Sequence, residues 1–310
     1  MLLEQLLNGI GIGCTYALIA LGFSLQFSVL RIVNLAFGEV FMASAFAALL
    51  CTQHISTNPL LVASTAIGAS ILIGLMVHFL AVRPLGNVAS VDSPRHLSVI
   101  ISTSGCSLIL HNLVLKYFGA NPIAFQRLVP DWSFQIGESS VKATLLLNFG
   151  VTVIVMFALL IWLKRSFIGL RIRAVAENKE LATATGIRAG YDETIAVLIS
   201  SALAGLAAVL ISQVVGSISH NTGLSYGLKG LIILIVAGAG NFVGAVITAM
   251  FLGVSETFAA YFSSSYRDAV AFSLLLLLLV GREFTRAQVP RFTEVFRTLV
   301  RIFRTLIKSS

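Results

Sequence analysis

Long uncharged stretches alternate with short polar connections along most of this chain. A helix of about 20 apolar residues crosses the roughly 30 Å hydrocarbon core of a bilayer. The pattern predicts an all-α fold, a polytopic membrane helix bundle of about eight or nine segments with interrupted helices. The expected segments are 9–30, 35–51, 59–82, 97–118, 143–163, 194–217, 226–239, 242–262 and 268–281.

Composition supports this class and argues against several others. Charged residues make up 11% of the chain and hydrophobic residues 57%, whereas about a quarter of the residues in a soluble domain are charged. The net charge of +8 comes from basic residues in loops beside the apolar segments. Membrane topology explains that placement, so we expect no nucleic-acid partner. The three cysteines lie in apolar segments without metal-ligand spacing, and no metal site is predicted.

The basic residues also indicate orientation. If the C-terminus is cytoplasmic, the loops 31–34, 83–96, 164–191 and 282–310 face the cytoplasm and carry 16 of the 21 Lys and Arg residues. We therefore expect a membrane domain over 1–284. Residues 285–310 are expected to form a separate amphipathic basic helix on the anionic membrane lipid.

Residues 226–262 form either one long helix or two segments that are broken at the glycine-rich run 237–241. A single helix would place the basic tail on the opposite side from the loop 164–191. The charge rule therefore favours the break. Non-helical backbone at membrane depth requires cover by protein or a water-filled cavity.

Ionisable residues inside apolar segments are costly and suggest function. Glu39 follows Gly38 and Asn34 near the start of the second segment. These residues favour a loop or half-helix there, or alternatively a helix start near the inner interface that Glu39 caps. Lys229 and Glu256 are interpreted as structural groups near the outer boundary, where a lysine can extend its charge to water.

The polar loop 164–191 holds six Lys and Arg residues, and its stretch 174–185 has the composition of a helix. A basic helical loop on the cytoplasmic side is a surface on which a soluble partner can push. Transport that is driven by an attached motor is therefore the first hypothesis. The chain has no phosphate-binding loop, no His-Glu-x-x-His and no Cys-x-x-Cys motif, so we expect no catalytic residues and no enzyme activity.

Three stretches together resemble the permease subunits of branched-chain amino acid ABC importers of the LivH type. They are residues 34–42, in which Phe37 replaces the usual histidine, residues 173–187 and the glycine-rich residues 236–245. Residues 111–119 add weaker support. The resemblance covers roughly residues 5–281.

The resemblance implies a permease that passes branched-chain or other small hydrophobic amino acids across the bacterial inner membrane. Its implied partners are a second, similar permease subunit, two cytoplasmic ATP-binding subunits and a periplasmic substrate-binding protein. ATP and Mg would be bound by the ATP-binding subunits, and no cofactor is expected in this chain. The candidate substrate pathway is Asn34, Phe37, Gly38, Glu39, Gly238, Gly240, Asn241 and Gly244. The candidate surface for ATPase coupling is Arg173, Ala174, Glu177, Asn178, Glu180, Leu181, Ala182 and Gly186.

Three alternatives remain at this point. The same family includes urea and short-amide permeases, which Gly240, Asn241 and Gly244 match equally well. An ion-coupled carrier would need Glu39 and Glu256 to titrate. An intramembrane enzyme would need a nucleophile and a base, for which Ser255 and His111 are the candidates.

Overall fold

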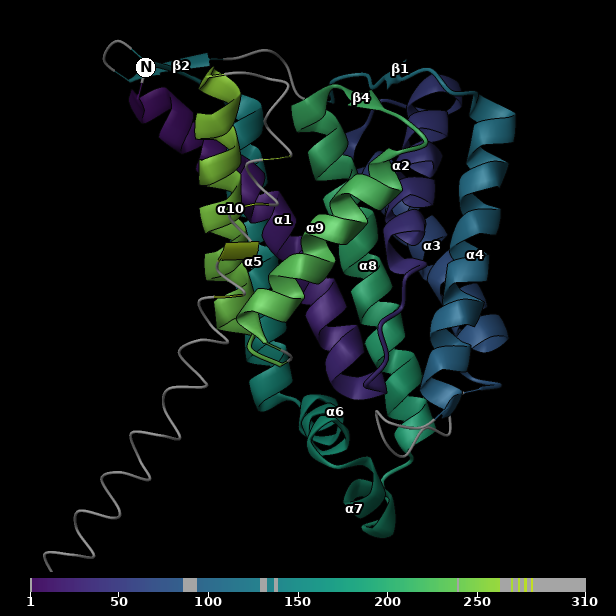
Figure 1. The fold of residues 1–310 in the computed structure, drawn as a ribbon. Coiled ribbons are helices and arrows are strands. Elements are labelled where there is room, and N and C mark those ends of the chain that lie inside the picture. The colour runs from purple at the N-terminus through teal and green to yellow at the C-terminus, as the bar shows by residue number, and fades with distance from the viewer. Residues whose placement is uncertain are drawn as a thin grey trace, which may run out of the picture.

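The computed structural model describes residues 2–85, 94–128, 133–136, 139–238, 240–262 and the single positions 269, 273, 276, 277 and 280. These residues form a bundle of helices (Figure 1). The helices are α1 (Leu2–Leu30), α2 (Phe37–His54), α3 (Pro59–Val77) with a π-helical turn η1 (His78–Val82), α4 (Pro94–Phe118), α5 (Ala143–Arg165), α6 (Phe167–Glu177), α7 (Lys179–Ala184), α8 (Ala189–Val215), α9 (Thr222–Ala237) and α10 (Phe242–Phe262). The predicted all-α membrane bundle is confirmed.

Six helices of the described part are long and apolar enough to cross a membrane. They are Gln5–Leu30, Pro59–Val82, Leu97–Phe118, Ala143–Arg165, Ala189–Val215 and Phe242–Ala260. The helices α2 and α9 are shorter, with 18 and 16 residues. The predicted segment 268–281 is described only at the single positions named above, and the tail 285–310 lies outside the described residues.

The core is built around α1, which packs against α5, α8, α9 and α10. Small residues let α1 and α10 approach closely. A Cβ atom on Gly13 would lie 2.7 Å from the Cα of Met250, and one on Gly9 would lie 2.6 Å from the Cα of Val254. Close approach through small residues is the usual way in which membrane helices gain packing energy. The helices α1 and α10 therefore form a tight pair.

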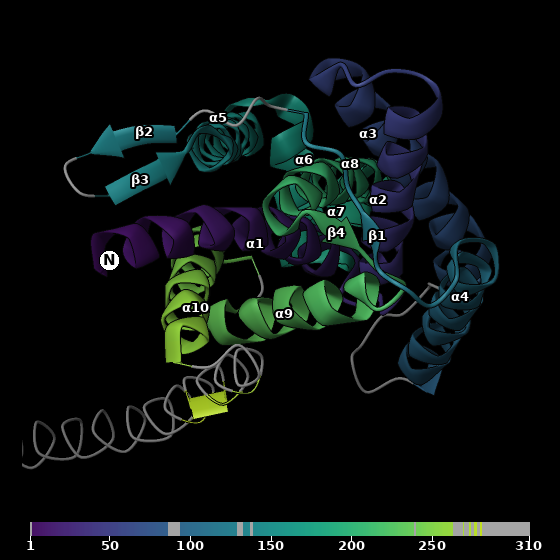
Figure 2. The same ribbon diagram turned by 90° about the horizontal axis from the view of Figure 1, so that it is seen from above.

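Four short strands, which the apolar pattern did not predict, are found in the connections. The strands β1 (Ile123–Ala124) and β4 (Ser217–Ile218) pair antiparallel. The strands β2 (Ser133–Ile136) and β3 (Ser139–Lys142) form a hairpin beside α1 and α5 (Figure 2). In Figure 1 both pairs lie at the end of the bundle opposite α6 and α7.

The predicted break between α9 and α10 is confirmed. The helix α9 ends at Ala237, and Gly238 and Gly240 have φ angles of 89° and 77°. Only glycine adopts this left-handed region without strain. Asn241 then caps α10, because its Oδ1 accepts the N–H of Gly244 at 3.0 Å.

The predicted single helix over 174–185 is wrong. The chain breaks at Asn178, which has φ −152° and ψ 108° and separates α6 from α7. Its side-chain Oδ1 accepts the N–H of Leu181 at 3.0 Å and so caps the start of α7. An asparagine favours such a cap over a helix interior, because its side chain competes for backbone hydrogen bonds.

Candidate functional site

Residues 31–36 leave the helical conformation between α1 and α2. The ring of Phe37, at the start of α2, packs 4.4 Å from the ring of Phe23. Phe23 lies seven residues before the end of α1, which is about 10 Å along a helix axis. The start of α2 is therefore packed inside the bundle, as the half-helix alternative predicts. We name residues 31–36 the unwound segment.

Glu39 lies in the first turn of α2 and is 3% exposed. Its Oε1 is 3.8 Å from Nδ1 of His111 on α4, and its Oε2 has no hydrogen-bond partner. The ring of His111 meets the ring of His220, just before α9, at 5.3 Å in an edge-on arrangement. A buried carboxylate with an unpaired oxygen is unusual, because buried polar atoms normally find partners.

The helices α2 and α9 cross through glycines, without side chains between their backbones. A Cβ on Gly227 would lie 2.8 Å from the Cα of Gly38, and a Cβ on Gly223 would lie 2.6 Å from the free Oε2 of Glu39. The next turn adds an aromatic contact, in which the rings of Phe41 and Tyr226 are 5.7 Å apart. The crossing therefore places the free Oε2 of Glu39 next to the backbone of α9 at Gly223.

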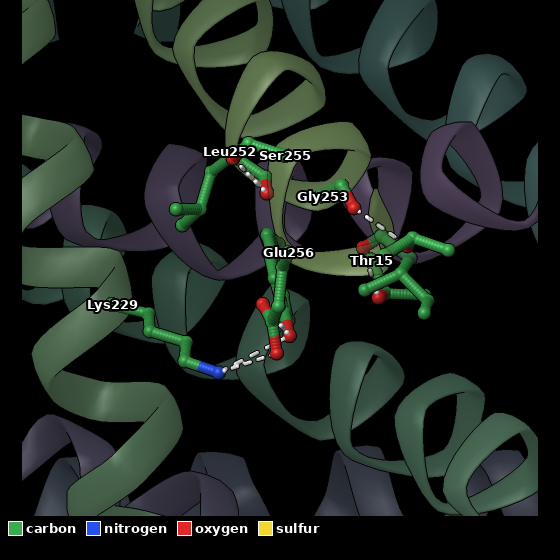
Figure 3. A network of polar contacts seen from close by, with 9 residues as sticks. Thr15, Lys229, Leu252, Gly253, Ser255 and Glu256 are labelled. Atoms are coloured by element: carbon green, nitrogen blue, oxygen red, sulfur yellow. Dashed lines mark hydrogen bonds and ion pairs between the residues drawn. The ribbon is translucent and has the colours of Figure 1, made fainter. Parts of the chain in front are cut away.

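A second intramembrane carboxylate is fully paired. Glu256 of α10 accepts hydrogen bonds from Nζ of Lys229 at 2.9 Å and from the hydroxyl of Tyr16 at 2.8 Å. Figure 3 shows the ion pair between α9 and α10. Lys229 is 4% exposed and also lies over the rings of Tyr16 and Tyr226. The prediction that Lys229 extends toward water at the outer boundary is wrong, because an internal partner neutralises its charge.

The structure separates the predicted pathway residues into two groups. Asn34, Phe37, Gly38 and Glu39 are buried along α9. The second group, Gly238, Gly240, Asn241 and Gly244, lies at and beyond the far end of α9 and is exposed or half-buried. Gly240 lines a cavity of about 360 Å³ together with Arg31 and residues of α6.

The predicted coupling residues lie on α6, α7 and the turn between them, at one end of the bundle (Figure 1). Arg173, Glu177 and Glu180 are exposed. Asn178, Leu181 and Gly186 are also exposed, whereas Ala174 is half-buried and Ala182 is buried at 5% exposure. Gly186 has a φ of 88°, which suits the end of α7.

Two ion pairs that sequence reasoning missed fasten these helices to α8. Nη2 of Arg171 lies 2.9 Å from Oδ2 of the fully buried Asp192. Nζ of Lys179 lies 2.6 Å from Oε1 of Glu193. Asp192 and Glu193 directly follow the predicted loop 164–191. Acidic residues next to a basic loop are the sequence signal that could have indicated these ion pairs. The pairs connect α6 and α7 to α8.

An apolar groove of about 660 Å³ opens beside the coupling residues. Its lining includes Phe167, Leu170 and Tyr191, which are 73%, 55% and 59% exposed, together with Gly186. Large apolar side chains beside a polar rim are typical of a surface that binds another protein. Sequence reasoning did not single out these three residues.

The residues proposed for an intramembrane enzyme do not meet. Ser255 Oγ donates to the carbonyl of Leu252 at 2.8 Å, whereas His111 lies beside Glu39. Among the described residues, no group of three or more His, Cys, Asp or Glu side chains has the arrangement of a metal site. Ser255 and His111 therefore do not form a nucleophile–base pair. The site instead consists of polar groups and interrupted backbone.

Comparison with known proteins gives a consistent result. The family described as the permease component of the branched-chain amino acid transport system matches residues 5–280. The high-affinity branched-chain amino acid transport system permease protein BraD of Pseudomonas aeruginosa is 34% identical over 295 residues, which cover 90% of this chain and 94% of BraD. LivH of Salmonella typhimurium and LivH of Escherichia coli K12, permeases described in the same words, are 33% and 32% identical and cover 90% of this chain and 92% of each relative. No solved structure matches the chain.

Proposed function

This chain belongs to the permease family of branched-chain amino acid transport systems, and from that premise we propose that it passes branched-chain amino acids across the bacterial inner membrane as one subunit of an ABC importer. The proposed partners are a second permease subunit, two cytoplasmic ATP-binding subunits and a periplasmic binding protein. ATP and Mg would be bound by the ATP-binding subunits. The relatives named above are described as branched-chain amino acid permeases, which favours these solutes over urea or short amides.

The free Oε2 of Glu39 is the observation on which the proposed pathway rests. Glu39 lies in the first turn of α2, directly after Gly38 of the glycine crossing with α9. An α-ammonium group supplies the donors that this oxygen lacks. The buried Oε1 of Gln26 is also without a partner, and Gln26 borders one small void together with Asn34 of the unwound segment. A passing amino acid would satisfy such groups in turn.

The break between α9 and α10 is proposed to serve the same pathway at its cytoplasmic end. Interrupted helices expose backbone donors and acceptors at membrane depth, and transporters use such groups to bind small polar solutes. Gly240 is exposed and borders the cavity that also contains Arg31. The solute would leave by this cavity after passing Glu39.

The exposed face of α6 and α7 is the proposed docking surface for the ATP-binding subunit. Arg173, Glu177 and Glu180 supply charge, and Leu181, which is 66% exposed, supplies an apolar contact. The groove around Phe167 and Tyr191 continues this surface. The ion pairs of Arg171 and Lys179 with α8 would connect this surface to the bundle.

Uptake into proteoliposomes tests the function. The chain would be reconstituted with its partner permease, ATP-binding subunits and binding protein, and uptake of radiolabelled leucine measured. We expect uptake that requires ATP, persists when ion gradients are collapsed, and is inhibited by isoleucine and valine. Inhibition by urea or acetamide alone would contradict the amino acid assignment, and uptake that follows an ion gradient without ATP would contradict the ABC mechanism.

Thiol labelling tests the pathway. Single cysteines would replace Asn34, Gly38 and Gly240 in a chain without its native cysteines, with Leu72 as the matched control because its exposed side chain lies on α3, outside the proposed path. We expect small polar thiol reagents to reach the path positions in at least one nucleotide state and to leave position 72 unaffected by nucleotide. Uniform inaccessibility of the path positions would contradict the proposed route.

A further inference from the structure

Arg31 has a backbone conformation that does not suit an arginine. Its φ of 56° lies in the left-handed region, and Arg31 is the one non-glycine residue of the described chain with positive φ. Its N–H donates to the carbonyl of Phe27 at 2.8 Å, which closes the last turn of α1. Glycine would serve this backbone better. The reason for an arginine must therefore lie in its side chain.

The side chain of Arg31 bridges to α6. Its Nη2 donates to the carbonyl of Ala176, in the last turn of that helix. The last carbonyls of a helix have no partner within the helix, and the helix dipole favours a cation there. The contact therefore has a sound electrostatic basis, although Arg31 and Ala176 are far apart in the sequence.

The contact between Arg31 and Ala176 lies next to the proposed pathway. Arg31 is the first residue of the unwound segment, which leads within a few residues to Asn34 and Glu39. It also borders the 360 Å³ cavity at Gly240, in the break between α9 and α10. Arg31 thus connects the proposed docking helix to the unwound segment and lines the cavity at the second interruption.

We infer that Arg31 transmits displacement of α6 to the unwound segment, and so links events at the ATP-binding subunit to opening of the pathway at Glu39. This inference rests on the proposed function and adds a positioning residue to it. When α6 moves, the carbonyl of Ala176 draws the guanidinium with it. The guanidinium therefore connects α6 directly to the first residue of the unwound segment.

The substitution Arg31→Gly isolates the side chain, because glycine fits the observed φ and the fold should be kept. In the reconstituted complex, we expect ATP hydrolysis close to that of the parent complex and leucine uptake lowered by about tenfold, within the usual range of coupling between separate sites. Arg31→Lys keeps a cation but loses the planar donor group, and should give an intermediate loss. Arg83→Ala is the matched control. Arg83 is an exposed arginine after η1 whose guanidinium lies over the ring of Phe79.

The amount of leucine transported per ATP hydrolysed is the deciding quantity. An unchanged ratio in Arg31→Gly would overturn the inference. This holds whether uptake and hydrolysis both keep the parent values or both fall by the same factor, which indicates a purely structural role. If the parent complex shows no ATP-driven uptake, the proposed function fails instead. The two failures are therefore distinguishable.

A second readout does not depend on the solute. A cysteine at position 34 would be labelled with and without ATP, in the parent chain and in the Arg31→Gly background. We expect its reactivity to respond to ATP in the parent chain and to lose that response in Arg31→Gly. Equal responses in the two backgrounds would overturn the inference whatever the transported solute is.

Discussion

Glu39 and Glu256 are both buried carboxylates inside the bundle, yet their surroundings are opposite. Glu256 has a lysine at 2.9 Å and a tyrosine hydroxyl at 2.8 Å. Glu39 has an imidazole at 3.8 Å, and its other oxygen has no hydrogen-bond partner. The three elements that meet at Glu256, α1, α9 and α10, are held together by that pairing. Glu39 instead faces the crossing of α2 and α9.

We propose that this difference separates a structural site at Glu256 from a transport site at Glu39. Around Glu256, glycines let α1 and α10 touch, so charge and packing both fix the arrangement. Around Glu39, α2 and α9 also approach through glycines, but the Oε2 atom of Glu39 accepts no hydrogen bond that would add to this packing. We propose that this free oxygen is available to a passing solute. Substitutions at the two sites should therefore differ in their effects on stability and transport.

Breaking the Glu256 pair should give the largest loss of stability. Removing one partner of a buried ion pair leaves the other charge uncompensated, which costs about 3–5 kcal/mol. We expect Lys229→Met to lower the free energy of unfolding by this amount, as measured by denaturant unfolding in detergent micelles. The double variant Lys229→Met, Glu256→Met should recover most of the loss. If the single and double variants are equally unstable, the pair has no special role.

Removing the tyrosine hydroxyl should have a smaller effect in the same direction. Tyr16→Phe keeps the ring beside Lys229 but leaves Glu256 with one donor fewer. A hydrogen bond to a charged group contributes about 2 kcal/mol. Tyr117→Phe, on an exposed tyrosine of α4, is the matched control and should be neutral. A loss from the control equal to that from Tyr16→Phe would show that the effect is not specific to the network.

Filling the glycine crossing tests the other region. A Cβ in Gly227→Ala meets the backbone at Gly38, and the helices must separate slightly. Overpacking of this kind costs about 1 kcal/mol or somewhat more. We expect this modest loss in unfolding measurements together with an altered ATP dependence of thiol labelling at position 34. Gly68→Ala is the control, since a Cβ at Gly68 meets no atom within 4 Å. Unaltered labelling in Gly227→Ala would contradict a mobile crossing.

The sequence predicted the features that depend on local chemistry. Charge-free runs predicted the long helices, and the distribution of basic loops predicted the break at the glycine-rich run, where Gly238 and Gly240 have positive φ angles. It did not predict the break at Asn178, because the surrounding residues favour helix on both sides and the cap depends on the fold. The partners of Glu39 and Glu256 come from distant helices, so their opposite environments could not be predicted from spacing.

The substitution Glu39→Gln tests the central claim most directly. In the reconstituted complex we would measure ATP-driven leucine uptake and ATP hydrolysis, together with the free energy of unfolding of the isolated permease. The account predicts uptake lowered by about tenfold, since one charge-assisted hydrogen bond contributes about 1.5–3 kcal/mol, with hydrolysis and stability at or above the values of the unmodified chain. A variant that transports leucine at the full rate, or that loses stability as Lys229→Met is expected to do, would contradict it.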